Sequence, residues 1–244
     1  MPVPLAIIFD LDDTLFDDAG CTLAGLNALA AGYPALAALP QSELFARHSR
    51  LLTALEGEVY AGTLSVEACR VRRLGQLLAS VGVPDADAEA AAVTYHAASR
   101  AHYRPLPGAL ELVRGLHARG IRLGVLTNYP RGVQTAKLDA CGLTPYLSAA
   151  TTTSDAPPKP DPASYYMACR ALEVGPEQAV MVGDNWSNDV AGAAAAGLRA
   201  VWYNPSGRVA SADVPCVSLS SFLPLEAALT VLLSDGDSGQ PVTQ

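Results

Sequence analysis

The sequence predicts an α/β fold: a doubly wound, Rossmann-like parallel sheet with helices on both faces. Three observations support this prediction. Short, mainly apolar runs at residues 5–9, 121–126 and 179–182 are typical of strands buried on both faces. Each run ends in polar residues, and helical patterns lie between the runs. Strands that alternate with single helices favour parallel pairing through right-handed crossovers.

The helices of this alternating region are placed by their end signals. Residues 108–119 are followed by Gly120, and residues 132–141 by Gly142. A glycine just past the last turn is a common end of a helix. We also expect two further strands and three further helices, the strands at 200–203 and 216–219 and the helices at 162–172, 189–196 and 224–233.

Residues 19–103 interrupt the alternation. They hold four helix-like segments separated by glycine and proline, at 22–31, 41–56, 65–81 and 86–103. We therefore expect a helical cap domain at 19–103, inserted after the first strand into a catalytic core of residues 1–18 and 104–235. Residues 236–244 are small, polar and acidic, which is typical of a flexible tail.

Composition and charge exclude several classes of protein. The net charge is −8 and basic residues are scattered, which argues against a nucleic acid polymer as a partner. No apolar run approaches the roughly 20 residues of a membrane helix, and the first residues lack the features of a signal peptide. The five cysteines never form a CxxC pair and the four histidines lack metal-ligand spacing. We expect a cytoplasmic protein that does not bind membranes; the oligomeric state stays unknown.

Two acidic residues follow the first strand. Asp10 and Asp12 project to one side if extended geometry continues that far. Carboxylates this close need a cation or a proton, and an oxygen-only cluster suits Mg²⁺. A carboxylate held in this way can attack phosphorus. Because acidic turns are common, the pair alone leaves an ordinary turn as an equal alternative.

Polar residues further along the chain favour the chemical interpretation. Thr127 and the backbone N–H of Asn128 follow the second strand and could donate hydrogen bonds to phosphate oxygens. Lys159 lies in a proline-stiffened stretch and is one of only two lysines in the chain. Asp184 and Asp189 form a second acidic pair after the strand at 179–182. In a doubly wound sheet, residues at the carboxyl ends of the strands meet at the ligand site.

Four motifs in this order resemble the haloacid dehalogenase superfamily, in particular its phosphatase branch with a helical cap of the C1 type. They are FDLDDTLF at 9–16, LTN at 126–128, Lys159 in PPKPDP, and GDNWSNDVAGAAAAG at 183–197. The match spans the whole expected core. The cap resembles the family more weakly, through the stretch at 60–67 followed by Arg70 and Arg73.

The resemblance implies a phosphatase that hydrolyses a phosphomonoester of a small metabolite. Asp10 would attack phosphorus and carry the phosphate as an aspartyl ester. Asp12 would first protonate the leaving oxygen and then deprotonate the attacking water, and both roles agree with carboxylate chemistry.

The resemblance also implies a Mg²⁺ cofactor and the residues that surround it. The metal would contact the Asp10 carboxylate, the main-chain carbonyl of Asp12, and Asp184. Asp189 would act from a second layer by orienting the waters of the metal or Lys159. Neutralising the transferred phosphoryl group is most of the protein's task in such a reaction, and the residues implied for it are Thr127, Asn128 and Lys159.

Three alternatives remain to be weighed. A 2-haloacid dehalogenase on the same fold lacks an acid two residues after the nucleophile, so Asp12 argues against it. A phosphoryl mutase shares every motif and stays open. An Asp-phosphorylated signalling receiver is disfavoured because its acidic pair precedes its phosphoacceptor, whereas here a second acidic pair follows Lys159. The substrate stays unknown, and the cap residues that could read it are Arg47, His48, Tyr60, Arg70 and Arg73.

Overall fold

The computed structural model describes residues 4–211 and 213–234, which fall into two compact units. The core comprises Met1–Asp17 and Arg104–Gln244, and the cap comprises Asp18–Tyr103. Each unit has its own hydrophobic interior. The tail expected at 236–244 lies outside the described residues.

The core is built on a sheet of six parallel strands in the order β3-β2-β1-β4-β5-β6. This arrangement confirms the predicted α/β class. The chain starts at the middle of the sheet, builds outward to β3, and then returns to build outward from β4 on the other side. The strands are β1 (Ala6–Phe9), β2 (Arg122–Leu126), β3 (Ala149–Thr151), β4 (Ala179–Gly183), β5 (Arg199–Tyr203) and β6 (Cys216–Leu219).

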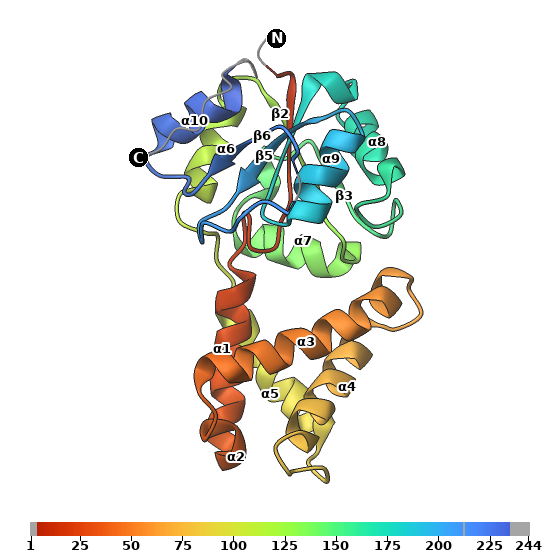
Figure 1. The fold of residues 1–244 in the computed structure, drawn as a ribbon, viewed down its shortest axis with the longest axis vertical. Coiled ribbons are helices and arrows are strands. Elements are labelled where there is room, and N and C mark those ends of the chain that lie inside the picture. The colour runs from red at the N-terminus through yellow and green to blue at the C-terminus, as the bar shows by residue number, and fades with distance from the viewer. Residues whose placement is uncertain (1–3, 212, 235–244) are drawn as a thin grey trace. The chain divides into compact units, whose positions relative to one another are not determined.

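Helices cover both faces of this sheet, with α8 and α9 on one face and α6 and α10 on the other (Figure 1). The core helices are α6 (Ala109–His117), α7 (Arg131–Ala140), α8 (Pro162–Ala171), α9 (Gly192–Ala195) and α10 (Leu225–Leu233). The short helical turns of the core are η1 (Thr144–Tyr146), η2 (Pro176–Gln178) and η3 (Trp186–Ala191).

Close packing fixes the strands on which the site depends. Tyr165 of α8 is fully buried in a cluster with Ile8 of β1 and Met181 of β4. In β2, a Cβ on Gly124 would lie 2.9 Å from a terminal methyl group of Leu172, so a larger residue would force that side chain to shift. Burying one large apolar side chain contributes about 1.5–3 kcal/mol, and the cluster therefore stabilises the packing of α8 on the central strands.

Two core elements differ from the sequence prediction. Strand β3 was not expected, because Ala149–Thr151 is a short edge strand of small residues without an apolar run. A helix was expected at 189–196, but the helical turn η3 already begins at Trp186 and has π geometry. Asn185 caps it by accepting a hydrogen bond from the backbone N–H of Asn188, which moves the start forward.

The cap contains five helices, one more than the four expected segments. Leu26 and Leu29 of the first helix pack with Tyr95 of the last. A Cβ on Gly25 would lie 2.5 Å from the ring of Tyr95, so glycine allows these two helices to approach. The helices are α1 (Asp18–Gly32), α2 (Pro34–Ala37), α3 (Gln41–Tyr60), α4 (Val66–Ala79) and α5 (Ala88–Ala101).

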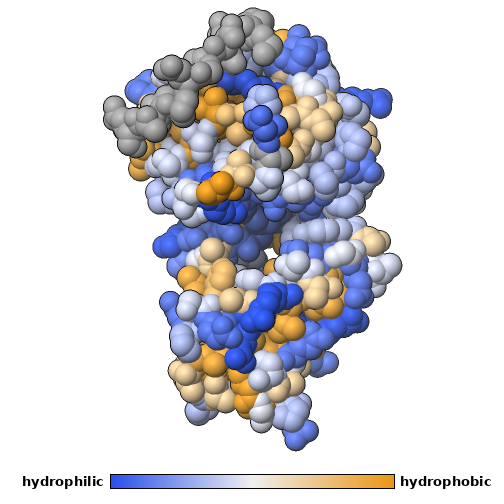
Figure 2. All heavy atoms as spheres, viewed as in Figure 1, coloured by the Kyte–Doolittle hydropathy of each residue, from blue (hydrophilic) through white to orange (hydrophobic). Residues whose placement is uncertain are grey.

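On the face viewed in Figure 2, apolar and hydrophilic side chains are interspersed over each unit. Among the described residues, none of the helices has both the length and the apolar character needed to cross a membrane.

Candidate active site

Strand register brings the predicted site residues to one edge of the sheet. Phe9 of β1 is in register with Val125 of β2 and with Val182 of β4, so the residues that follow these strands emerge together. The backbone N–H of Asp10 donates to the carbonyl of Val182 at 2.8 Å. The order in which strands are added reverses between β1 and β4, and doubly wound sheets bind ligands at such a point.

Lys159 makes the central ion pairs of this edge. Its ammonium lies 2.7 Å from a carboxylate oxygen of Asp10 and 2.7 Å from one of Asp189, and only 2% of its side chain is exposed. Burial is the largest influence on its pKa and lowers it, but the charges of the two aspartates outweigh burial and raise the pKa. Lys159 is therefore a fixed cation beside Asp10.

The loop that carries Lys159 is held by Asn128. The side-chain amide of Asn128 donates to the carbonyl of Lys159 at 2.9 Å, and its oxygen accepts from the backbone N–H of Lys159 at 2.7 Å. The sequence assigned Asn128 only a backbone contact with phosphate. In the structure its side chain also positions the lysine.

Three carboxylates converge beside Lys159. One oxygen each from Asp10, Asp184 and Asp189 lies within 4.8 Å of the others. Burial, offset in part by Lys159 and reinforced by Asp189, raises the pKa of Asp10 to about 6. Burial and then the charges of Asp10 and Asp189 raise the pKa of Asp184 to about 7. Buried like charges of this kind are stabilised by a cation, and oxygen donors suit Mg²⁺.

The loop after β1 contributes Thr14, which was predicted only as part of a motif. Asp13 adopts a left-handed backbone conformation with φ of 57°, and the loop turns back there. The Thr14 hydroxyl accepts from the backbone N–H of Asp184 at 3.1 Å and lies 3.4 Å from a carboxylate oxygen of Asp10. Thr14 therefore ties the ends of β1 and β4 together.

Asp184 and Asp189 are fixed by their neighbours. A Cβ on Gly183 would lie 2.3 Å from the carboxyl carbon of Asp189, so glycine admits the buried carboxylate. The Asp189 oxygen that does not contact Lys159 accepts from the backbone N–H of Asn185 at 2.9 Å. Arg208 contacts Asp184 at both its carbonyl, 2.6 Å, and its carboxylate, 3.2 Å. Arg208 was not predicted as a site residue, because it lies in a loop without any motif.

The side chain of Asp12 contacts α7. One of its oxygens lies 2.5 Å from the ammonium of Lys137 and the other 3.0 Å from the amide nitrogen of Gln134. The same nitrogen lies 2.5 Å from the hydroxyl of Thr127. Neither Lys137 nor Gln134 was predicted as a site residue. The one feature of the sequence that could have indicated Lys137 is that the chain contains only two lysines.

Among the cap candidates, Arg47 is part-exposed, whereas His48 and Arg73 are buried. Arg47 is part-exposed and pairs with Glu43 at 2.6 Å. His48 is buried with its ring stacked on Tyr95 at 5.4 Å, and the guanidinium of Arg73 lies 5.7 Å from the same ring. Both ring nitrogens of His48 and Nε of Arg73 lack a hydrogen-bond partner among the residues that the structure describes.

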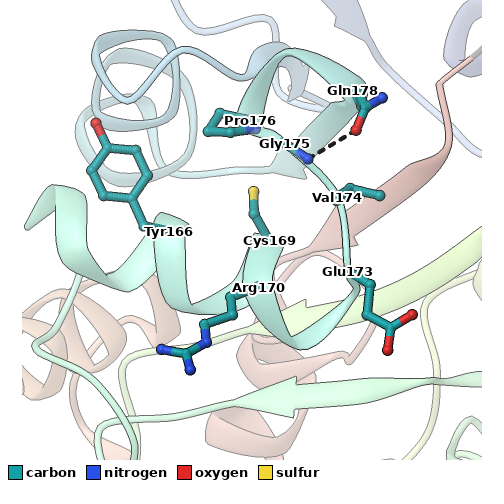
Figure 3. A pocket seen from close by; sticks show the side chains of 8 residues that line it. All are labelled: Tyr166, Cys169, Arg170, Glu173, Val174, Gly175, Pro176 and Gln178. Atoms are coloured by element: carbon teal, nitrogen blue, oxygen red, sulfur yellow. Dashed lines mark hydrogen bonds between the residues drawn. The ribbon is translucent and has the colours of Figure 1, made fainter.

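A hollow of about 360 Å³ lies at the other end of β4, away from this chemistry. Figure 3 shows the residues around it, which come from α8, from η2 and from the segment between them. Gln178 of its lining immediately precedes β4, whereas Asp184 immediately follows the strand. The hollow is therefore separate from the group of carboxylates.

Comparison with known proteins identifies the class to which this fold and site belong. A family model described as haloacid dehalogenase-like hydrolase matches residues 4–197, and the chain belongs to that family. The resemblance to its phosphatase branch is confirmed by relatives. A phosphoglycolate phosphatase of Rhodospirillum rubrum is 36% identical over 208 residues, covering 82% of this chain and 79% of its own. A phosphoserine phosphatase of Thermus thermophilus is 32% identical over 224 residues, covering 81% and 88%.

Solved structures show the same fold. A HAD-hydrolase from Bacillus subtilis, solved with magnesium bound, has a TM-score of 0.75 at 21% identity and covers 95% of this chain and 99% of its own. A 2-haloacid dehalogenase from Pseudomonas syringae has a TM-score of 0.60 at 30% identity, covering 94% and 99%. The scaffold is thus shared by phosphatases and dehalogenases, and the site residues have to distinguish them.

Proposed function

We propose that this protein is a Mg²⁺-dependent phosphatase that hydrolyses a phosphomonoester of a small metabolite through an aspartyl phosphate on Asp10. The observation that carries the proposal is the buried Asp10 carboxylate, which is ion-paired with Lys159 beside Asp184 and Asp189. Phosphoryl transfer needs such a positioned nucleophile and fixed positive charge more than any other chemistry from the protein.

In the first step, a carboxylate oxygen of Asp10 forms a bond to phosphorus and the ester P–O bond breaks. The leaving oxygen takes its proton from Asp12. The Thr127 hydroxyl, the backbone N–H of Asn128 and the ammonium of Lys159 hold the transferred phosphoryl oxygens. Lys159 is suited to this role because it already lies 2.7 Å from Asp10.

In the second step, water attacks the phosphorus of the aspartyl phosphate. Asp12, now a carboxylate, takes the proton of that water, and the P–O bond to Asp10 breaks. Inorganic phosphate leaves and Asp10 returns to its carboxylate form. One side chain thus serves as acid and then as base, which a carboxyl group at one position can do.

The donor set fits Mg²⁺, which prefers carboxylate and carbonyl oxygens together with oxygens of the substrate phosphate. Asp10, Asp184 and the main-chain carbonyl of Asp12 would hold it. When bound, the ion neutralises charge on the phosphoryl group and on the acids. Both oxygens of Asp189 already accept hydrogen bonds, from Lys159 and Asn185, which supports a role in orienting Lys159.

The dehalogenase alternative is disfavoured by Asp12. A halide leaving group needs no proton, yet here a carboxylate stands two residues after the nucleophile and both its oxygens are held. The phosphoryl mutase shares these residues, and release of free phosphate distinguishes a phosphatase from a mutase.

The phosphatase relatives act on phosphoglycolate and phosphoserine by name, which supports a small phosphorylated metabolite as substrate. Five free cysteines agree with a cytoplasmic location.

A rapid-mixing experiment with an activated aryl phosphate tests the proposal. Wild-type protein should release phosphate in the presence of Mg²⁺. Asp12→Asn should give a burst of phenol followed by slow turnover, because the leaving group needs no proton but the water still needs a base. A phosphate that can be trapped on Asp10 should accompany the burst. Wild-type turnover by Asp12→Asn, or no phosphate release from any ester by the wild type, would refute the proposal.

A further inference from the structure

Helix α7 holds both carboxylate oxygens of Asp12. The ammonium of Lys137 contacts one oxygen at 2.5 Å, and the amide nitrogen of Gln134 contacts the other at 3.0 Å. The two residues are three positions apart on the helix and therefore share one face. Asp12 is thus fixed by the core itself, with a donor on each oxygen.

Lys137 is buried beside Asp12 and two aromatic rings. Its side chain is 8% exposed, and its ammonium lies 4.7 Å from the ring centroid of Phe16 and 5.8 Å from that of Tyr129. Phe16 belongs to the same loop as Asp12. Burying an ammonium costs free energy unless a carboxylate compensates it, so the position of the lysine is tied to that of Asp12.

Gln134 is 1% exposed, and its amide nitrogen donates to Thr127 as well as to Asp12. Its amide oxygen has no hydrogen-bond partner within the described part of the chain. A buried, half-satisfied amide is costly, and an apolar side chain would fill the same space without that cost. Because the Thr127 hydroxyl accepts from Gln134, its own proton is left to donate to a phosphoryl oxygen.

We propose that Lys137 and Gln134 are positioning residues that hold the side chain of Asp12 where it takes the proton of the attacking water. The inference rests on the proposed function. In that step the water oxygen bonds to phosphorus, the proton moves to Asp12, and the electron pair of the broken P–O bond returns to Asp10. A donor on each oxygen fixes the orientation of the carboxyl group.

Replacement by methionine tests this role, because methionine matches the length of glutamine, is one atom shorter than lysine, and lacks the donors of both. Lys137→Met and Gln134→Met should each lower kcat, by about 10²-fold if Asp12 shifts by about 1 Å, with KM little changed. Both should still give the phenol burst and a phosphate on Asp10. Arg131→Met is the matched control, since it removes from the same helix an exposed cation that pairs with Asp155.

A double-mutant cycle separates positioning from mere stability. In an Asp12→Asn background, Lys137→Met should cost no further turnover, because no base is left to position. The inference is wrong if Lys137→Met lowers kcat as much in the Asp12→Asn background as it does in the wild type. It is also wrong if both single variants keep the wild-type kcat, or if thermal unfolding shows that neither variant is folded. If the wild type hydrolyses esters and Asp12→Asn shows the phenol burst, but the effects of Lys137→Met and Asp12→Asn are additive, then only the positioning role is wrong. If the wild type releases no phosphate, the proposed function falls with it.

Discussion

The core and the cap both bury charged side chains, but they treat them differently. In the core, Lys159 pairs with Asp10 and Asp189, and Lys137 pairs with Asp12. In the cap, Arg73 is buried against the ring of Tyr95, and its Nε has no hydrogen-bond partner in the described residues. The neighbouring His48 has none at either ring nitrogen there.

This difference indicates different purposes. A buried ion pair adds little net stability, so a core that contains several of them in one place uses them to fix geometry for chemistry. An aromatic ring compensates a buried guanidinium only in part. The cap therefore carries a cost in stability where it buries the positive charge of Arg73. We expect changes in the core to decide whether the reaction occurs, and changes in the cap to decide which ester is accepted.

The largest effect should come from Asp10→Asn. An amide cannot form the covalent ester, so phosphate release should vanish for every substrate while the fold persists. Measurement of phosphate release from an aryl phosphate and a metabolite panel, with circular dichroism as the control for folding, checks this. A phenol burst from Asp10→Asn would show that another residue is the nucleophile.

Chelation of the metal should abolish activity reversibly. Burial and mutual repulsion raise the pKa of Asp10 to about 6 and that of Asp184 to about 7, so the group of acids is poorly compensated by protein alone. Excess chelator should stop phosphate release and added Mg²⁺ should restore it. Mn²⁺, which favours similar oxygen ligands, should substitute, and Ca²⁺ should inhibit. Undiminished turnover in excess chelator would break the assignment of the core to metal-dependent chemistry.

The meeting of Asp10, Thr127 and Asp184 could be predicted from the sequence because apolar runs mark β1, β2 and β4, and parallel strands end at one edge. Edge strand β3 could not be predicted, since Ala149–Thr151 has no apolar run. Lys159 follows none of these strands and was placed in the site only by its motif. The resemblance left open whether Asp189 orients the waters of the metal or Lys159, and the structure shows the contact with Lys159.

The contacts of Asp12 were missed for a different reason. Gln134 and Lys137 lie on a helix whose sequence looks ordinary, and they reach Asp12 only because α7 packs beside the loop after β1. Hydrogen bonds between side chains so distant in sequence depend on tertiary packing, which periodicity does not encode. The burial of His48 and Arg73 was missed similarly, because a polar residue on an amphipathic helix is usually exposed.

Removing the buried cation of the cap should change substrate preference. Arg73→Met should lower kcat/KM for esters with a second anionic group by about 10- to 100-fold, the value of a charged hydrogen bond. Turnover of a small aryl phosphate should stay close to wild type. Arg50→Met, whose side chain is 72% exposed, is the control and should alter neither. Loss of aryl phosphate hydrolysis in folded Arg73→Met would show that the cap is needed for the reaction itself and not only for substrate preference.

The smallest effect concerns stability in acid and depends on His48. Burial, and then the charge of Arg73, lowers its pKa from 6.5 to about 3. Between these values the unfolded chain binds a proton that the folded cap does not, so acid favours unfolding. The contribution of neutral His48 is fully present above pH 6.5 and is lost progressively as the pH falls toward 3, amounting to about 2 kcal/mol by pH 5.

His48→Phe keeps a ring to stack on Tyr95 and removes the titrating group. Urea unfolding at pH 7 and pH 5 should therefore show a smaller loss of stability for this variant than for the wild type. His117→Phe, which replaces an exposed histidine of α6, should behave as the wild type does. Equal acid sensitivity of wild type and His48→Phe would mean that the cap opens enough to hydrate His48. The burial of the His48 ring nitrogens without hydrogen-bond partners in the described residues, which distinguishes the cap from the core, would then not exist in solution.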